Sequence, residues 1–244
     1  MEGTSVSSSR SVTRTTSSFV RRSPSLALPR VLLCDLDGTL IDTMPVLADL
    51  ASEVIVEHYG LPRVLARELY VTTCGLPFIH QLESIFPGDE RNALVSAIFE
   101  TAKPARCSHA RMPADTLAAL RSLQNRGVRI ALSSNNGRDN VEAFARQADF
   151  TFDLVMGYGD GLAKGATQIG LAERTFGVNR GEMLFIGDSL HDGEIAQTNR
   201  ISFVGVAGTF SKDRFTLRFP GQPIVHRFSD LLGLFETPRA AVAG

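Results

Sequence analysis

The residues best suited to chemistry lie in three segments far apart in the sequence: residues 35–40 (DLDGTL), Lys164, and residues 187–192 (GDSLHD). Asp35 and Asp37 are two residues apart, so in an extended chain both carboxylates project to the same side. Carboxylates this close repel each other and normally need a cation or a shared proton. Mg²⁺ prefers oxygen ligands and typically binds one or two carboxylates together with a substrate phosphate. These residues therefore indicate a magnesium and phosphate site.

The elements that must position these residues are buried strands. Short apolar runs at 31–34, 128–132 and 183–186 are typical of such strands. Each run is followed by acidic or small polar residues, namely Asp35, Ser133-Ser134-Asn135 and Gly187-Asp188. In open α/β sheets, ligands bind outside the carboxyl ends of the strands. We therefore expect these groups to gather on one rim of a sheet.

Helical and strand-like apolar patterns alternate along most of the chain, which predicts an α/β fold with a mainly parallel sheet covered on both faces. Between about residues 45 and 111 the pattern is helical throughout. Breaks in this stretch are expected at Gly60, Gly75, Pro87-Gly88 and Pro104. The sequence thus predicts a sheet domain that is interrupted after its first strand by an all-helical cap.

These patterns divide the chain into an arm (residues 1–29), a sheet domain (30–44 and 112–236), the cap (45–111) and a tail (237–244). The arm is rich in Ser, Thr and Arg and contains one acid, Glu2. That composition is typical of a disordered segment and also of an organellar transit peptide. We expect a cytoplasmic protein, or an organellar one if the arm is a transit peptide.

The motif DLDGTLIDT at residues 35–43, with the later polar strand ends in the matching order, resembles the haloacid dehalogenase-like superfamily. It resembles in particular the phosphoglycolate phosphatase-like branch of that superfamily, which has a helical C1-type cap after the first strand. The resemblance covers residues 31–234 and implies a Rossmann-like, three-layer core. It also implies Mg²⁺-dependent hydrolysis of a small phosphorylated metabolite through an aspartyl phosphate.

The resemblance implies a catalytic or phosphate-binding role for five residues. Asp35 matches the nucleophile, which attacks phosphorus, and Asp37 matches the general acid and base. Ser134, Asn135 and Lys164 match the groups that bind the phosphate.

The resemblance also implies the ligands of Mg²⁺. Asp35, the backbone carbonyl of Asp37 and the carboxylate of Asp188 are expected to bind the ion, with Asp192 as a supporting acid. Mg²⁺ is therefore the one cofactor that we expect.

Three positions depart from the usual family pattern. Gly165 follows Lys164 where proline is frequent, Asn136 replaces a frequent lysine, and residues 197–200 (QTNR) replace a run of small residues. They argue against phosphoglycolate as the substrate without removing a catalytic group. Two alternative functions stay open: a sugar-phosphate mutase, which Thr39 disfavours, and a non-catalytic binding protein, which the intact acids and lysine disfavour.

The cap supplies the expected selectivity residues. Its turn at residues 72–75 is expected to face the rim, where Thr73 offers a hydroxyl and Gly75 permits close approach of the backbone. Arg111, near the linker back to the sheet domain, is suited to bind a carboxylate or a second phosphate. An ordinary turn and a solvated arginine would explain these residues equally well.

Composition excludes other classes of function. Lys and Arg number 25 against 26 acids, so the net charge of −1 predicts no general attraction to nucleic acid or anionic membranes. No apolar run is long enough to span a bilayer. The three cysteines are scattered, which argues against a disulfide framework or zinc site. Composition does not determine the oligomeric state.

Overall fold

The computed structural model describes residues 26–235 of the chain. Its strands are β1 (Val31–Cys34), β2 (Arg129–Gly137), β3 (Leu154–Tyr158), β4 (Met183–Gly187), β5 (Ser202–Val206) and β6 (Ile224–Val225). Its helices are α1 (Met44–Tyr59), α2 (Arg63–Thr73), α3 (Phe78–Ile85), α4 (Asn92–Arg106), α5 (Ala114–Asn125), α6 (Arg138–Gln147), α7 (Ala166–Phe176), α8 (Leu190–Asn199) and α9 (Lys212–Arg218), with 3-10 turns η1 (Arg180–Glu182) and η2 (Phe228–Leu234).

Within the described residues the strands form one six-stranded sheet in the order β3-β2-β1-β4-β5-β6, and every neighbouring pair is parallel. β1 is central, and all four of its residues are buried. An entirely apolar strand is stable in this position because helices cover both faces of the sheet. The parallel α/β sheet predicted from the sequence is confirmed, and β6 lies at an edge as expected.

Successive residues of β1 point to opposite faces of the sheet. Leu32 belongs to a buried cluster with side chains of α5, α6 and η2. Leu33 belongs to a second cluster with side chains of α7, α8 and α9. The sheet is therefore the middle of three layers, which confirms the predicted Rossmann-like core.

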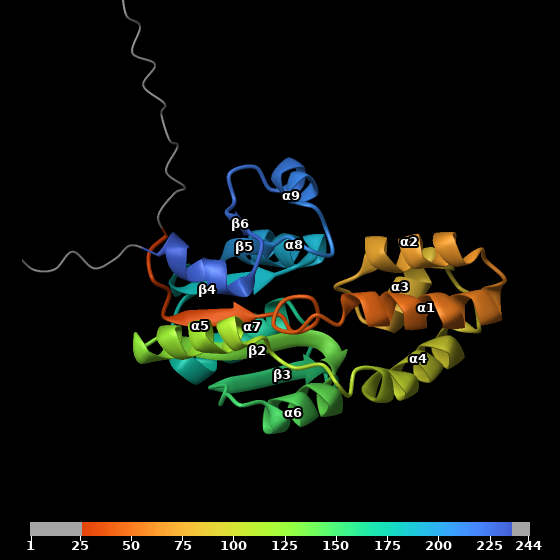
Figure 1. The fold of residues 1–244 in the computed structure, drawn as a ribbon, viewed down its shortest axis with the longest axis horizontal. Coiled ribbons are helices and arrows are strands. Elements are labelled where there is room, and N and C mark those ends of the chain that lie inside the picture. Colours follow the sequence, from red (N-terminus) through yellow and green to blue (C-terminus); the bar gives the residue numbers. More distant parts are fainter. Residues whose placement is uncertain (1–25, 236–244) are drawn as a thin grey trace, which may run out of the picture.

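Helices α1–α4 pack around a hydrophobic cluster of their own, which includes Leu47, Ile55, Phe78 and Phe99. They lie beside the sheet on the side toward which β1 points (Figure 1). The chain thus inserts an all-helical cap after the first strand, next to the carboxyl ends of the parallel strands.

One predicted helix boundary is wrong. Pro104 lies inside α4, which continues to Arg106, and the backbone N–H of Cys107 still donates to the carbonyl of Lys103 at 3.0 Å. A proline in a helix removes the hydrogen bond to the carbonyl four residues earlier, and its ring crowds that carbonyl, but the other helical hydrogen bonds can remain. The helix therefore tolerates Pro104 in its last turns, and Lys103 keeps a fixed helical position.

Only residues 26–29 of the predicted arm are among the described residues. There, the backbone N–H of Leu26 donates to the carbonyl of Leu234 at 2.7 Å, and Leu26 forms a bridge with Phe235. Residues 1–25 and the tail predicted at 237–244 lie outside the described range. In the described part of the chain, no helix is both long and apolar enough to cross a membrane.

Candidate active site

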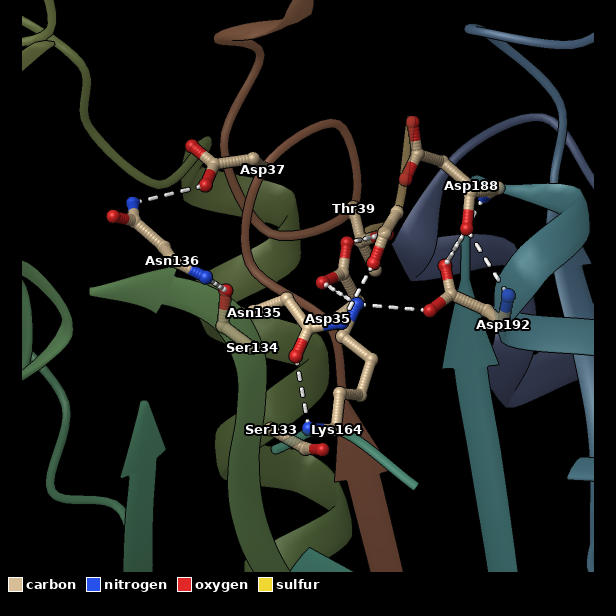
Figure 2. Close-up of polar contacts among 12 residues, drawn as sticks. Asp35, Asp37, Thr39, Ser133, Ser134, Asn135, Asn136, Lys164, Asp188 and Asp192 are labelled. Atoms are coloured by element: carbon tan, nitrogen blue, oxygen red, sulfur yellow. Dashed lines mark hydrogen bonds and ion pairs between the residues drawn. The ribbon is translucent and has the colours of Figure 1, made fainter. Parts of the chain in front are cut away.

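Three charged residues meet at the end of β1. Asp35 follows β1 directly, Lys164 lies in the loop before α7, and Asp192 lies in the first turn of α8. The ammonium of Lys164 is 2.5 Å from Oδ1 of Asp35 and 2.8 Å from Oδ1 of Asp192 (Figure 2). The Lys164 side chain is only 2 % exposed. Because buried charges need partners, these contacts hold both carboxylates around one ammonium group.

Burial shifts the protonation of this cluster. It raises the pKa of Asp35 to about 6, although the Lys164 ammonium opposes the shift. Burial and the charges of Asp35 and Asp192 raise the pKa of Asp188 well above its usual range. For Lys164, burial acts to lower the pKa, but the carboxylates of Asp192 and Asp35 outweigh it and raise the pKa. The buried acids therefore favour an additional cation.

Asp188 reaches this cluster across the turn that follows Asp35. Its carboxylate accepts a hydrogen bond from the Thr209 hydroxyl and lies against Gly38. Gly38 has a φ of +87°, and a Cβ at this position would overlap Oδ2 of Asp188. Glycine is therefore required both for the turn and for the close approach of Asp188.

The donor set suits a divalent cation. Among the described residues, carboxylate oxygens of Asp35, Asp188 and Asp192 lie within 4.8 Å of one another, and all three residues are buried. Oxygen-only donors are what Mg²⁺ prefers. The structure brings together the predicted ligands Asp35 and Asp188, while the carboxylate of Asp37 lies outside this group, as expected if only its backbone carbonyl binds the ion.

Asp37 lies on the other side of the site, where two uncharged side chains hydrogen-bond its carboxylate and the Lys103 ammonium lies 4.0 Å from its Oδ2. The hydroxyl of Thr43 donates to its Oδ1 at 2.7 Å, and the amide of Asn136 donates to its Oδ2 at 3.1 Å (Figure 2). Asn136, which replaces the frequent lysine of the family, thus gives Asp37 a hydrogen bond without a charge. The carboxylate of Asp35 thus hydrogen-bonds an ammonium directly, whereas the hydrogen bonds to Asp37 in the described part of the chain come from uncharged side chains.

The end of β2 links the sheet to both neighbouring loops. The side chain of Asn135 accepts from the backbone N–H of Lys164 at 2.9 Å and donates to the carbonyl of Gly75 in the cap at 2.7 Å. The Ser134 hydroxyl accepts from the backbone N–H of Asn136 at 3.0 Å. Asn135 therefore positions the loop of Lys164 and the cap turn at the same time.

Gln168, which the sequence analysis did not select, holds the backbone behind this strand end. Its amide donates to the carbonyls of Ser134 at 3.0 Å and Gly157 at 3.3 Å, and it accepts from the Ser133 hydroxyl at 2.6 Å. The residue is fully buried. Its spacing of four residues from Ala172, which lies on the apolar face expected for this helix, was the available signal.

A cavity of about 50 Å³ lies between the strand ends and the cap. The sheet domain lines it with all the predicted core residues, namely Asp35, Asp37, Ser134, Asn135, Lys164, Asp188 and Asp192. The cap lines it with side chains that include Tyr70, Phe78, Glu100 and Lys103. Two of its lining residues also border larger cavities: Asp37 borders one of about 360 Å³, and Glu100 borders one of about 440 Å³.

The turn of the cap meets the rim at Gly75. A Cβ on this residue would lie 2.5 Å from Oγ of Ser189 and 2.9 Å from Cβ of His191, and its φ is +96°. The neighbouring Thr73 uses its hydroxyl inside the cap, where it donates to the carbonyl of Leu69 at 2.8 Å and to Oε1 of Gln81 at 3.1 Å. A role in selectivity for Thr73 stays a prediction.

Arg111 lies at the linker between cap and sheet domain. Its guanidinium donates to the carbonyls of Ser108 at 2.9 Å and Ala110 at 2.8 Å. It lines a separate cavity of about 360 Å³, which also borders Asp37 and Lys103. Its contact with a substrate stays a prediction.

Two cap residues that the sequence analysis did not select face the cavity between the strand ends and the cap. Glu100 and Lys103 lie one turn apart on α4, and both line the cavity. Val95, Phe99 and Lys103 recur at intervals of four residues, which places a lysine on the apolar face of the helix. That interval was a signal in the sequence.

Comparison with known proteins agrees with this geometry. The sequence profile of the haloacid dehalogenase-like hydrolase family matches residues 32–206. A phosphoglycolate phosphatase from Yersinia pseudotuberculosis is 28% identical over 218 residues, which cover 84% of this chain and 92% of that protein.

Solved structures share the fold at lower identity. A haloacid dehalogenase-like family hydrolase from Streptococcus pneumoniae superposes with a TM-score of 0.71 at 18% identity, covering 88% of this chain and 99% of that one. A hydrolase from Pseudomonas syringae gives a TM-score of 0.71 at 18% identity, covering 84% and 96%. With its acidic strand ends, buried lysine and inserted helices, this chain belongs to the haloacid dehalogenase-like hydrolase family.

Proposed function

We propose that the protein is a Mg²⁺-dependent phosphatase that hydrolyses small phosphate monoesters through an aspartyl phosphate on Asp35. The observation that carries the proposal is the contrast between two aspartates only two residues apart. The buried carboxylate of Asp35 hydrogen-bonds the Lys164 ammonium at 2.5 Å. The carboxylate of Asp37 hydrogen-bonds the uncharged side chains of Thr43 and Asn136, and the nearest ammonium, that of Lys103, is 4.0 Å away. One carboxylate is held in place for attack, and the other can exchange a proton.

Asp35 acts first in this scheme. Its Oδ1 is held by Lys164 and its Oδ2 accepts from the Thr39 hydroxyl at 3.2 Å, so the carboxylate has a fixed orientation. A carboxylate oxygen attacks phosphorus while the bond to the leaving oxygen breaks, which replaces one difficult step with two easier ones. Pre-orientation of the carboxylate lowers the entropic part of the barrier.

Asp37 serves both steps. As an acid it donates a proton to the leaving alcohol oxygen, and as a base it accepts a proton from the water that hydrolyses the aspartyl phosphate. Its hydrogen bonds to Thr43 and Asn136 keep the carboxyl group on the side of the cavity away from Asp188. The cycle therefore returns both aspartates to their starting protonation states.

Several groups at the strand ends are suited to bind the phosphoryl group. Lys164 and the hydroxyl of Ser134 line the cavity, and Asp35 and Asp188 are the residues that would hold Mg²⁺. A bound Mg²⁺ supplies charge that offsets the negative phosphoryl oxygens. The family relative that acts on phosphoglycolate supports a small phosphate ester as substrate.

The cap limits the size of the substrate. Helices α1–α4 cover the strand ends and leave a cavity of about 50 Å³ directly above the aspartates, with larger cavities of about 360 Å³ beside Asp37 and about 440 Å³ beside Glu100. A phosphorylated protein side chain on a folded domain does not fit under such a cover. The proposal therefore specifies small metabolites as substrates.

Trapping the covalent intermediate tests the proposal. We expect the purified protein to hydrolyse p-nitrophenyl phosphate with Mg²⁺. Acid quenching during turnover should show a mass increase of one phosphoryl group on the peptide that contains Asp35. Hydrolysis without any phosphorylated Asp35 would contradict the mechanism, and binding of phosphate esters without turnover would favour the non-catalytic alternative.

A further inference from the structure

Helix α4 of the cap presents an acid and a base to the catalytic cavity. Glu100 and Lys103 are three residues apart, so they lie on neighbouring turns of one helix face. Both residues line the cavity that holds Asp35 and Asp37. Residues three apart on a helix commonly pair, but within residues 26–235 these two side chains form no ion pair with each other, and the Lys103 ammonium instead lies 4.0 Å from Oδ2 of Asp37.

Glu100 has an unmet acceptor. Its Oε2 atom is buried and has no hydrogen-bond partner among the described residues. Burial raises the pKa of Glu100, while the charge of Lys103 opposes that shift. A buried polar atom without a partner destabilises the fold, so its presence calls for a functional explanation. A hydrogen-bond donor on a bound ligand would satisfy it.

Lys103 is also mostly buried at the edge of the cavity. It is 7 % exposed, and its ammonium lies 4.0 Å from Oδ2 of Asp37, which is beyond hydrogen-bond distance. The ring of Phe99 packs 5.7 Å from the ammonium. No hydrogen bond from this ammonium occurs within the described part of the chain. A buried lysine in this state is suited to an oxygen atom of a ligand.

The positions of the two residues follow the expected path of a leaving group. Asp37 must reach the bridging oxygen of the ester, and Lys103 is the charged cap residue beside it. Glu100 lies one turn earlier and also borders a second cavity of about 440 Å³, which extends over the ends of β2 and β3. A carbon chain attached to the bridging oxygen would therefore pass Lys103 and then Glu100.

We propose that Glu100 and Lys103 recognise the leaving group, and that the preferred substrates are phosphate esters of hydroxyl-bearing alcohols, such as polyol or sugar phosphates. A substrate hydroxyl donates to Oε2 of Glu100, and a substrate oxygen accepts from the ammonium of Lys103. This inference rests on the proposed phosphatase function. It disfavours phosphoglycolate, because the carboxylate of that leaving group would face the acid of Glu100.

Selectivity ratios provide the test. We would measure kcat/KM with glycerol phosphate, ribose 5-phosphate, phosphoglycolate and p-nitrophenyl phosphate for wild type, Glu100→Met, Glu100→Gln and Lys103→Met. Methionine removes the acceptor, whereas glutamine keeps an uncharged one and a similar size. Glu90→Gln and Lys212→Met are matched controls at exposed positions.

We expect Glu100→Met and Lys103→Met to lose about 10- to 100-fold more activity on the two hydroxylated esters than on p-nitrophenyl phosphate. Glu100→Gln should lose less than Glu100→Met, and both should gain on phosphoglycolate relative to wild type. Because an unmet buried acceptor is removed, Glu100→Met should also melt about 2–6 °C higher. The exposed controls should leave every ratio unchanged.

Equal losses on all four esters would overturn the inference, as would a wild-type preference for phosphoglycolate over both hydroxylated esters. Neither outcome would contradict the phosphatase function, because the wild-type protein would still hydrolyse p-nitrophenyl phosphate. Failure of the wild type to hydrolyse any ester would instead refute the proposed function, and this inference with it.

Discussion

The ammonium of Lys164 lies 2.5 Å from Oδ1 of Asp35, although the two residues are 129 positions apart in the sequence. We expect Lys164→Met to lower kcat about 10²- to 10³-fold, because the carboxylate loses the cation that orients it and the phosphoryl group loses a positive charge. Steady-state kinetics with p-nitrophenyl phosphate would measure the loss.

The same variant should be unstable. Methionine leaves the buried carboxylates of Asp35 and Asp192 without their ammonium, and breaking such a cluster costs about 3–5 kcal/mol of unfolding free energy. Urea denaturation without metal would measure it. Lys212→Met, an exposed change of the same type, should alter neither quantity. Full stability of Lys164→Met would contradict the assigned contacts.

Asp35→Asn should abolish turnover and leave the fold intact, because an amide of the same shape is a poor nucleophile. Residual activity above a few percent of wild type, after exclusion of deamidation by mass spectrometry, would rule out Asp35 as the nucleophile. Circular dichroism would check the fold.

The difference in stability between Asp35→Asn and wild type should depend on pH. Folding raises the pKa of Asp35 from 3.8 to about 6, so the metal-free folded state binds the proton more tightly than the unfolded state. The contribution of Asp35 to the unfolding free energy of wild type therefore falls as pH rises from about 4 to about 6, by at most about 3 kcal/mol. In EDTA, the melting temperature of Asp35→Asn should exceed that of wild type more at pH 8 than at pH 4. An equal difference at both pH values would contradict the shift.

Asp37→Asn should slow turnover about 10²- to 10⁴-fold, since neither the leaving oxygen nor the attacking water would exchange a proton with residue 37. With p-nitrophenyl phosphate, whose leaving group departs without protonation, phosphorylated Asp35 should accumulate. A rapid-quench experiment would show a burst of p-nitrophenol. Asp42→Asn, an exposed change in the same loop, is a matched control. If the phosphoenzyme of Asp37→Asn broke down at the wild-type rate, Asp37 could not be the base.

Removal of the metal should abolish hydrolysis. Without a cation the carboxylates of Asp35, Asp188 and Asp192 repel an incoming phosphate, so EDTA should stop hydrolysis and Mg²⁺ should restore it. Ca²⁺ should inhibit, because it is larger, takes more oxygen ligands and can bind both oxygens of Asp35. Mg²⁺ should also raise the melting temperature, since it binds the folded state. Full activity in EDTA would refute the metal requirement.

Gly75→Ala should separate the cap from the rim. The new Cβ would lie 2.5 Å from Oγ of Ser189, so the cap must shift, and a shift of about 1 Å can lower kcat/KM about 100-fold. Gly60→Ala is the control, because Gly60 also has a positive φ, of +72°, but no atom lies within 4 Å of a Cβ there. Both variants should lose stability, but only Gly75→Ala should lose activity. If Gly75→Ala and Gly60→Ala had the same kcat/KM, the position of the cap turn would not matter for activity.

Much of the fold follows from local patterns. The run VLLC has no polar position, so it is stable only in a strand covered on both faces, and β1 is indeed central. The acids and amides that follow the apolar runs had to meet at one rim because parallel strands end on the same side. The order of motifs was enough to predict the core residues of the site, and the structure places them around one cavity.

Other features depended on packing between distant segments. The sequence did not show that Asn136 would bind Asp37, or that Asn135 would join the Lys164 loop to Gly75 in the cap. Side-chain partners of this kind are determined by the separation and rotation of whole elements. Sequence periodicity gives the face of one element and not its distance from another.

The sequence by itself thus determined the order of strands and helices, the polar strand ends and the presence of a helical cap. The tertiary structure alone decided which way the cap presents its charges. The spacing of Val95, Phe99 and Lys103 places the lysine on the apolar face of α4, but it does not show which part of the sheet domain the end of that face meets. Packing of Val95 and Phe99 into the cap core rotates α4 so that its last turns face the aspartates. Helix rotation is a collective result of packing, because each buried side chain constrains the same rigid element.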